Sequence, residues 1–184
     1  CNLKCLFCDI PDITPAKEEM SREEACSVIE KVRRFGVHEI ILTGGEPLLH
    51  PHLFDIIGYA AAAGLKVVIT TNGLLIERYI NELKQYPLAC VCVSVDGMES
   101  THDFLRNRNG CFKQVVKGIR LLKDNNINTS VSCVVTNKNV YELEQLHVFF
   151  ADQGVNVDFL PVVNKPHLYP QKEDETRSFR SLIK

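Results

Sequence analysis

The sequence predicts an α/β domain in which parallel strands alternate with helices, arranged as a barrel or as an open doubly wound sheet. Two observations predict this class. Helix-like and strand-like segments alternate from about residue 20 to residue 163, and helical crossovers of that kind join parallel strands. Polar residues gather at the carboxyl ends of the strand-like segments, which is where α/β folds place their ligand sites.

Caps and apolar periodicity place the individual elements. Ser21, with Glu24 three residues later, forms a capping box that starts the first helix, and Gly36 ends it. From Leu53 onward, apolar residues recur at i, i+3, i+4, i+7 and i+8, which marks an amphipathic helix ended by Gly64. In chain order, the predicted elements are a helix at 21–34, a strand at 37–42, a helix at 53–61, a strand at 65–71, a helix at 74–84, a strand at 88–95, a helix at 112–122, a strand at 127–135, a helix at 140–150 and a strand at 155–163.

The strand at 88–95 is apolar or small on both faces, as expected of a parallel strand covered by helices. Because side chains alternate along a strand, we expect Ser94 and Asp96 to share a face with Cys90 and Cys92. That face would be the interior of a barrel.

The sequence near each end of the chain supports one further expectation. A loop with three cysteines precedes the helix at 21–34, so a strand is expected before that loop, outside this sequence. Residues 164–184 are polar and charged, with a hint of helix after Lys172. We therefore expect a core domain at 1–163, truncated at its N-terminus, and the start of a C-terminal extension at 164–184.

Composition excludes several classes of protein. With 21 basic and 23 acidic residues, the chain has no electrostatic footprint for nucleic acid or for an anionic membrane. No apolar run approaches the roughly 20 residues that span a bilayer. The eight cysteines stand in a chain with regular apolar periodicity, whereas disulfide frameworks belong to short, loop-rich secreted chains. We therefore expect a cytoplasmic protein.

The strongest chemical signal is the spacing of Cys1, Cys5 and Cys8 on one loop. Three thiolates can hold three irons of a cubane iron–sulfur cluster and leave the fourth iron open to a small molecule. A structural zinc site is the alternative, and it needs a fourth ligand. Histidines that would supply this ligand are His38, His50 and His52.

The cysteine triplet, followed by the Gly44, Gly45, Glu46 and Pro47 run after the strand at 37–42, resembles the radical S-adenosylmethionine (SAM) superfamily. The resemblance implies a partial (β/α)6 TIM-like barrel. It also implies a [4Fe–4S] cluster on the three cysteines that reductively cleaves SAM to a 5′-deoxyadenosyl radical, which abstracts hydrogen from a substrate. The competing hypothesis is a zinc or iron–sulfur module without catalysis.

The resemblance also assigns SAM contacts. The glycine turn would meet the methionine ammonium, with Glu46 adding a charged hydrogen bond and Pro47 fixing the turn. Arg106 would pair with the methionine carboxylate, as a guanidinium fork suits a carboxylate. The full set of implied contacts is Phe7 and Val134 on adenine, Gly44, Gly45, Glu46 and Pro47 on the methionine amine, Thr71 and Asn72 at the next strand end, Ser94 on SAM, Asp96 in the turn after it, and Arg106.

Within the superfamily, residues 102–122 look like the peptide-modifying and cofactor-building branches, including sulfatase maturases. The implied partners are a peptide or small-molecule substrate and an electron donor such as flavodoxin or ferredoxin. The other cysteines are expected to act as small buried hydrophobes. They are Cys26, Cys90, Cys92, Cys111 and Cys133.

Overall fold

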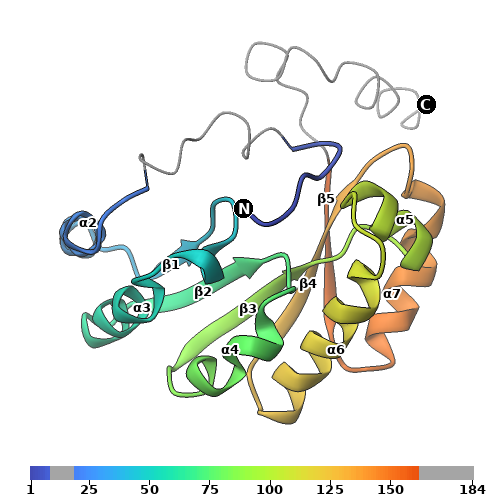
Figure 1. The fold of residues 1–184 in the computed structure, drawn as a ribbon. Coiled ribbons are helices and arrows are strands. Elements are labelled where there is room, and N and C mark those ends of the chain that lie inside the picture. The colour runs from blue at the N-terminus through green and yellow to red at the C-terminus, as the bar shows by residue number, and fades with distance from the viewer. Residues whose placement is uncertain (9–18, 162–184) are drawn as a thin grey trace.

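The computed structural model describes residues 1–8 and 19–161, and these build a five-stranded parallel sheet with helices between the strands (Figure 1). The strands stand side by side in chain order, from β1 to β5. This sequential order is that of a barrel wall, whereas a doubly wound sheet reverses its order at a switch point. The elements are α2 (Arg22–Arg34), β1 (Glu39–Leu42), the 3-10 helix η2 (Pro47–Leu49), α3 (Leu53–Ala62), β2 (Lys66–Thr71), α4 (Ile76–Leu83), β3 (Leu88–Ser94), α5 (Glu99–Leu105), α6 (Cys111–Asp124), β4 (Thr129–Val135), the 3-10 helix η3 (Val140–Glu142), α7 (Leu143–Ala151) and β5 (Asn156–Pro161).

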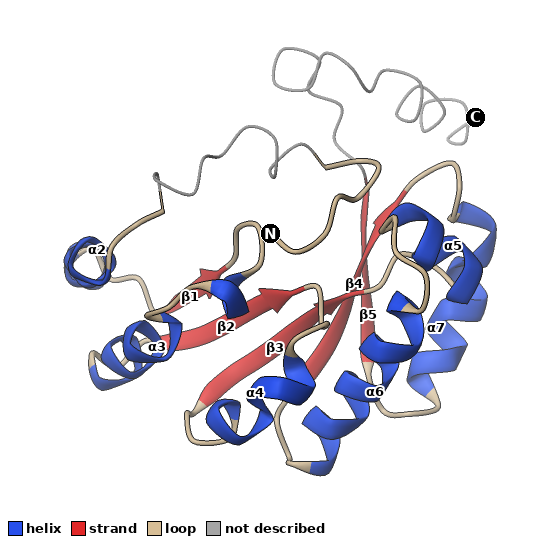
Figure 2. Cartoon of the chain, viewed as in Figure 1, coloured by secondary structure: helices blue, strands red, loops and turns tan. Residues whose placement is uncertain are grey.

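The helices α3, α4, α6 and α7 lie on one side of the sheet, so its two faces differ (Figure 2). Val91 and Val93 of β3 and Val131 of β4 point to the helices and are almost completely buried. The alternate residues of β3, among them Cys92 and Ser94, are only half-buried. The helix-covered face therefore holds the core, and the other face is left for a site.

All five predicted strands are confirmed, with ends that shift by one or two residues where the structure describes them. The capping box is confirmed too, since Ser21 Oγ accepts from the N–H of Glu24 and Glu24 Oε2 accepts from the N–H of Ser21. The predicted helix at 140–150 begins as the 3-10 turn η3 before α7.

Among the α-helices that the structure describes, α5 was not predicted. Helix α5 fills the segment between β3 and α6, where the sequence analysis placed no element. Residues 162 and 163 of the last predicted strand, the proposed extension at 164–184 and its hint of helix lie outside the described residues. Among the helices that the structure does describe, none has both the length and the apolar character needed to cross a bilayer.

Candidate functional site

The cysteine loop runs along the carboxyl ends of the strands (Figure 1). It is tied to the end of α5 because the Leu6 N–H donates to the Leu105 carbonyl over 2.9 Å. Leu3 and Cys5 are buried, while Cys1 is exposed. The predicted ligand loop is therefore docked at the edge of the sheet that the polar motifs indicate.

The three thiols share one loop, but their sulfur atoms are not gathered into a ligand cage. Within residues 1–8 and 19–161, no three His, Cys, Asp or Glu side chains are close enough together to hold a metal ion. Two of the three histidines considered as zinc ligands have other partners: His50 Nε2 lies 3.0 Å from the Met20 carbonyl, and His52 Nδ1 lies 3.6 Å from Asp55. Three soft sulfur donors fit an iron–sulfur cluster, and the loop would close around it.

The turn after β1 packs directly on the cysteine loop. A Cβ atom on Gly45 would lie 3.0 Å from Cys1 Cβ and 3.1 Å from the Cys1 nitrogen. Gly44 has a φ of +143°, a conformation that L side chains rarely adopt. The two glycines thus have separate roles. Gly44 adopts the backbone conformation that the turn requires, and Gly45 leaves space for Cys1.

Glu46 is buried in the same turn and accepts three hydrogen bonds. The donors are the Thr71 hydroxyl at 2.7 Å, the Asn72 N–H at 2.7 Å and the Leu48 N–H at 3.1 Å. Burial raises the pKa of the Glu46 carboxyl, and these hydrogen bonds oppose the rise. The carboxylate joins the end of β1 to the end of β2.

Asn72 extends this network to the cysteine loop. Its Nδ2 donates to Asn2 Oδ1 over 2.7 Å and lies 4.0 Å from Cys1 Sγ. Its Oδ1 accepts from the Leu74 N–H over 3.1 Å, which holds the side chain in place. The predicted site residues Thr71 and Asn72 are thereby brought together with Glu46 and the loop.

A second network stands at the end of β3. Asp96 is fully buried, and its Oδ2 lies 2.6 Å from Arg106 Nη2. Its Oδ1 accepts from the Val134 N–H over 2.8 Å. Burial raises the pKa of the Asp96 carboxyl, while the Arg106 charge opposes this. The structure thus pairs two residues that the sequence analysis had assigned separately.

Arg106 also reaches the cysteine loop. Its Nη1 lies 3.8 Å from Cys5 Sγ, within hydrogen-bonding distance for sulfur, and its Cζ lies 5.5 Å from the centre of the Phe7 ring. The predicted adenine contact Phe7 is therefore a cation–π partner of Arg106 in this structure.

Two polar residues that sequence reasoning missed support Asp96. His102 Nδ1 accepts from the Asp96 N–H over 3.1 Å, and its pKa is lowered to about 3 by burial and by the Arg106 charge. Asn139 Nδ2 donates to the Asp96 and Val134 carbonyls. Asn139 lies shortly after the end of β4, and a polar residue at that position could have been predicted as part of the site.

Ser94 and Val134 lie at neighbouring strand ends and are both half-buried. On the same face, Cys90 Sγ lies 3.5 Å from Ser130 Oγ, and Cys92 is half-buried too. The expectation that Cys90 and Cys92 are buried core residues is therefore wrong, because their strand positions face away from the helices. Cys111 and Cys133 are buried as predicted, whereas Cys26 is half-buried.

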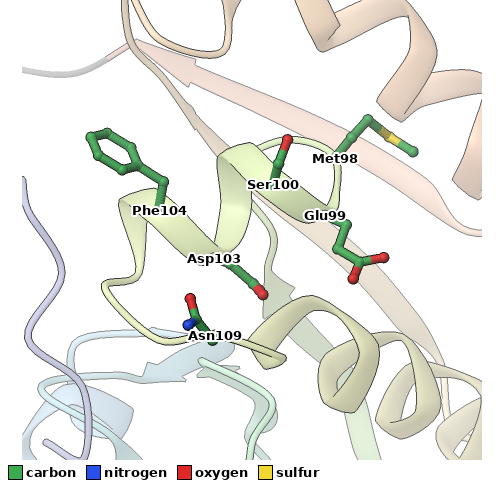
Figure 3. Close-up of a pocket in the computed structure, with 6 residues that line it drawn as sticks. All are labelled: Met98, Glu99, Ser100, Asp103, Phe104 and Asn109. Carbon is green, nitrogen blue, oxygen red and sulfur yellow. The ribbon is translucent and has the colours of Figure 1, made fainter.

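A shallow depression of about 630 Å³ lies on the outer side of α5 (Figure 3). Figure 3 shows the lining side chains on α5 and on the residue before it, pointing in different directions, with Asn109 on the loop that follows. None of the predicted site residues lines it. The lining residues are Met98, Glu99, Ser100, Asp103, Phe104 and Asn109. The candidate site is therefore the cysteine loop with the strand ends, and not this depression.

Two curated relatives show what the chain is similar to. It is 34% identical over 158 residues to the Fe-coproporphyrin III synthase of Methanosarcina barkeri, which covers 84% of this chain and 39% of the relative. It is 33% identical over 155 residues to the sporulation killing factor maturation protein SkfB of Bacillus subtilis, which covers 84% of this chain and 38% of the relative. The chain thus spans about two fifths of the length of these relatives.

Solved structures share the fold. The structure of native anSMEcpe with bound AdoMet and a peptide superposes with a TM-score of 0.75 at 23% identity, over 89% of this chain and 49% of that one. SuiB of Streptococcus suis bound to S-adenosylmethionine gives a TM-score of 0.75 at 18% identity, over 100% of this chain and 40% of that one. A sequence model described as the Radical SAM superfamily matches residues 1–150. The chain, with its barrel wall and its cysteine loop at the strand ends, belongs to the radical SAM superfamily of enzymes.

Proposed function

We propose that Cys1, Cys5 and Cys8 ligate a [4Fe–4S] cluster and that SAM binds beside it at the ends of β1 to β4. The observation that carries this proposal is the contact of the cysteine loop with the ends of β1 and β2 and with the end of α5. Gly45 packs on Cys1, Asn72 donates to Asn2, and Arg106 contacts Cys5. These contacts put the thiols beside the backbone and side chains that the family resemblance assigns to SAM.

The donor set suits an iron–sulfur cluster with one open iron. The loop supplies three thiols, and soft thiolate donors suit iron. When bound, the cluster supplies the electron that splits the SAM sulfonium and yields the 5′-deoxyadenosyl radical. The protein holds the two reacting groups together and keeps water from the radical.

The residues divide into groups that meet SAM and groups that support the site. The turn at Gly44 and Gly45 offers backbone groups to the methionine amine, and Ser94 and Val134 face the site from β3 and β4. Glu46 accepts two hydrogen bonds on Oε1 and one on Oε2, and these shape the glycine turn. Phe7 remains the proposed adenine contact, with Arg106 on its ring.

The substrate is proposed to be a peptide or a cofactor precursor of the tetrapyrrole kind. Support comes from the relatives, one named for an Fe-coproporphyrin III and one for maturation of a sporulation killing factor. Both are about two and a half times as long as the matched region, so in these relatives residues outside that region have room to select the substrate. A low-potential donor such as flavodoxin or ferredoxin is the proposed source of electrons.

Metal analysis of the anaerobically purified protein is the first test. We expect iron and acid-labile sulfide in equal amounts, with the visible absorbance of a [4Fe–4S] cluster. Zinc without iron or sulfide would refute the cluster and favour the structural zinc site.

SAM cleavage is the second test. Reconstituted protein incubated with dithionite and SAM is expected to release 5′-deoxyadenosine and methionine. A protein with a complete cluster that binds SAM and yields no 5′-deoxyadenosine would be a SAM-binding module without radical chemistry, which contradicts the proposal.

A further inference from the structure

We propose that Arg106 is a positioning residue for the cluster ligand Cys5 and that its guanidinium raises the reduction potential of the cluster. This inference rests on the proposed function, since it needs the cluster. It gives Arg106 a role that does not depend on SAM, unlike the carboxylate contact that the family resemblance implies.

The guanidinium lies between a carboxylate and a cysteine sulfur. Its Nη2 lies 2.6 Å from Asp96 Oδ2, and its Nη1 lies 3.8 Å from Cys5 Sγ. Arg106 is 8% exposed, and Cys5 is also 8% exposed. Because water is largely excluded there, the charge and the N–H donor act on the sulfur with little screening.

Neighbouring contacts fix the positions of Arg106 and Cys5 relative to each other. The Leu6 N–H donates to the Leu105 carbonyl, so the residues next to Cys5 and Arg106 are themselves bonded. Asp96 is fixed by the Val134 N–H on one oxygen, and the Phe7 ring covers the guanidinium at 5.5 Å. The contact between Arg106 and Cys5 is therefore set by the fold and is not a chance approach of a surface side chain.

The electronic effect has a definite sign. Reduction adds one negative charge to a cluster and its thiolates. A cationic N–H donor at a ligand sulfur stabilises the reduced form more than the oxidised form, which raises the potential. Removing the donor should therefore make the cluster harder to reduce.

The test compares cluster potentials without SAM. In the double variant Arg106→Gln, Asp96→Asn, the cation beside Cys5 and its carboxylate partner are both removed, so no carboxylate is left buried without a partner and the net charge is unchanged. The control is Arg108→Gln, which removes one cation from an exposed position two residues away and so reports any effect of net charge alone. All proteins are reconstituted anaerobically, assayed for iron and sulfide, and titrated with dithionite while reduced cluster is followed by electron paramagnetic resonance.

At a fixed solution potential we expect the double variant to show about a tenfold lower ratio of reduced to oxidised cluster, a 59 mV shift for one electron. The control should match the wild type. A double variant with full iron and sulfide and the wild-type potential overturns the inference, whereas a wild type that loads no cluster overturns the proposed function itself.

Arg106→Lys is the second variant, and it keeps a cation for Asp96. A lysine has one ammonium group and lacks the planar fork that spans the carboxylate and the sulfur, so a shift of the same sign and smaller size is expected. If Arg106 serves only the SAM carboxylate, both variants keep the wild-type potential and lose only SAM affinity, which equilibrium dialysis measures on the same samples. That pattern refutes the role at Cys5.

Discussion

Glu46 accepts a hydrogen bond from the Thr71 hydroxyl over 2.7 Å, and both residues are buried. The bond joins the turn after β1 to the end of β2. Since the same carboxylate also accepts from the Asn72 and Leu48 N–H groups, the acidic residue of the glycine turn stabilises the site from within. Its first role is to hold the strand ends where the cysteine loop docks.

Replacement of Glu46 by glutamine should destabilise the fold. The amide presents an NH2 group to at least one of the three donors, which leaves buried hydrogen-bonding groups without a partner. We expect the free energy of unfolding to fall by about 1–3 kcal/mol. Urea unfolding of the iron-free protein measures this. Glu39→Gln, at an exposed position at the start of β1, is the control, and an equal loss in both variants would contradict the buried role of Glu46.

Cys5→Ala should remove the cluster. Two thiolates on the loop cannot hold the cubane, so bound iron should fall to about a tenth of the wild-type content or lower. Iron and sulfide assays with visible spectra measure this outcome.

Cys26→Ala is the matched control for Cys5→Ala, because Cys26 lies half-buried in α2 and outside the loop. It should keep its iron. A Cys5→Ala protein that retains a full cluster would remove Cys5 from the ligand set.

Much of the fold was predictable because its signals are local. The capping box of Ser21 with Glu24 and the apolar strand β3 need no knowledge of the rest of the chain. Helix α5 has only seven residues and is mostly polar, so no apolar rhythm marks it. It forms where His102 accepts from the Asp96 N–H and packs against Phe112, and such contacts exist only after folding.

The site was predictable as a set of residues but not as a set of contacts. The cysteine spacing and the glycine turn indicate the chemistry from the sequence. The pairing of Asp96 with Arg106 could not be predicted from the sequence, because it depends on how α5 returns to the cysteine loop. The half-buried thiols of Cys90 and Cys92 were misjudged because a parallel strand of a partial barrel has one face without helices.

Gly45→Ala should displace the cysteine loop. The added methyl group would lie 3.0 Å from Cys1 Cβ, and the Cys1 backbone is too close to yield without moving the loop. We expect weaker cluster retention, seen as faster loss of iron to a chelator. Gly58→Ala in α3 is the control, since its methyl group meets only the Tyr86 ring, at 3.3 Å. Equal rates of iron loss in the two variants would show that Gly45 does not serve the loop.

His102 should make the fold sensitive to acid. Its pKa is about 3 in the folded protein, against an ordinary value of 6.5, so between these values the unfolded chain binds the extra proton. The free energy of unfolding therefore carries no penalty from His102 above pH 6.5, and it decreases as the pH falls from 6.5 toward 3. Between pH 7.5 and pH 5.5, His102 should lower the free energy of unfolding by about 1.4 kcal/mol.

Urea unfolding of the iron-free protein at these two pH values, with His102→Gln beside the wild type, measures the contribution. Glutamine does not titrate, so the variant should be less stable at pH 7.5 but should lose about 1.4 kcal/mol less on acidification. His147→Gln, at an exposed position on α7, should keep the wild-type response. If His102→Gln and the wild type lose the same free energy between the two pH values, His102 is not held neutral beside Asp96 and Arg106.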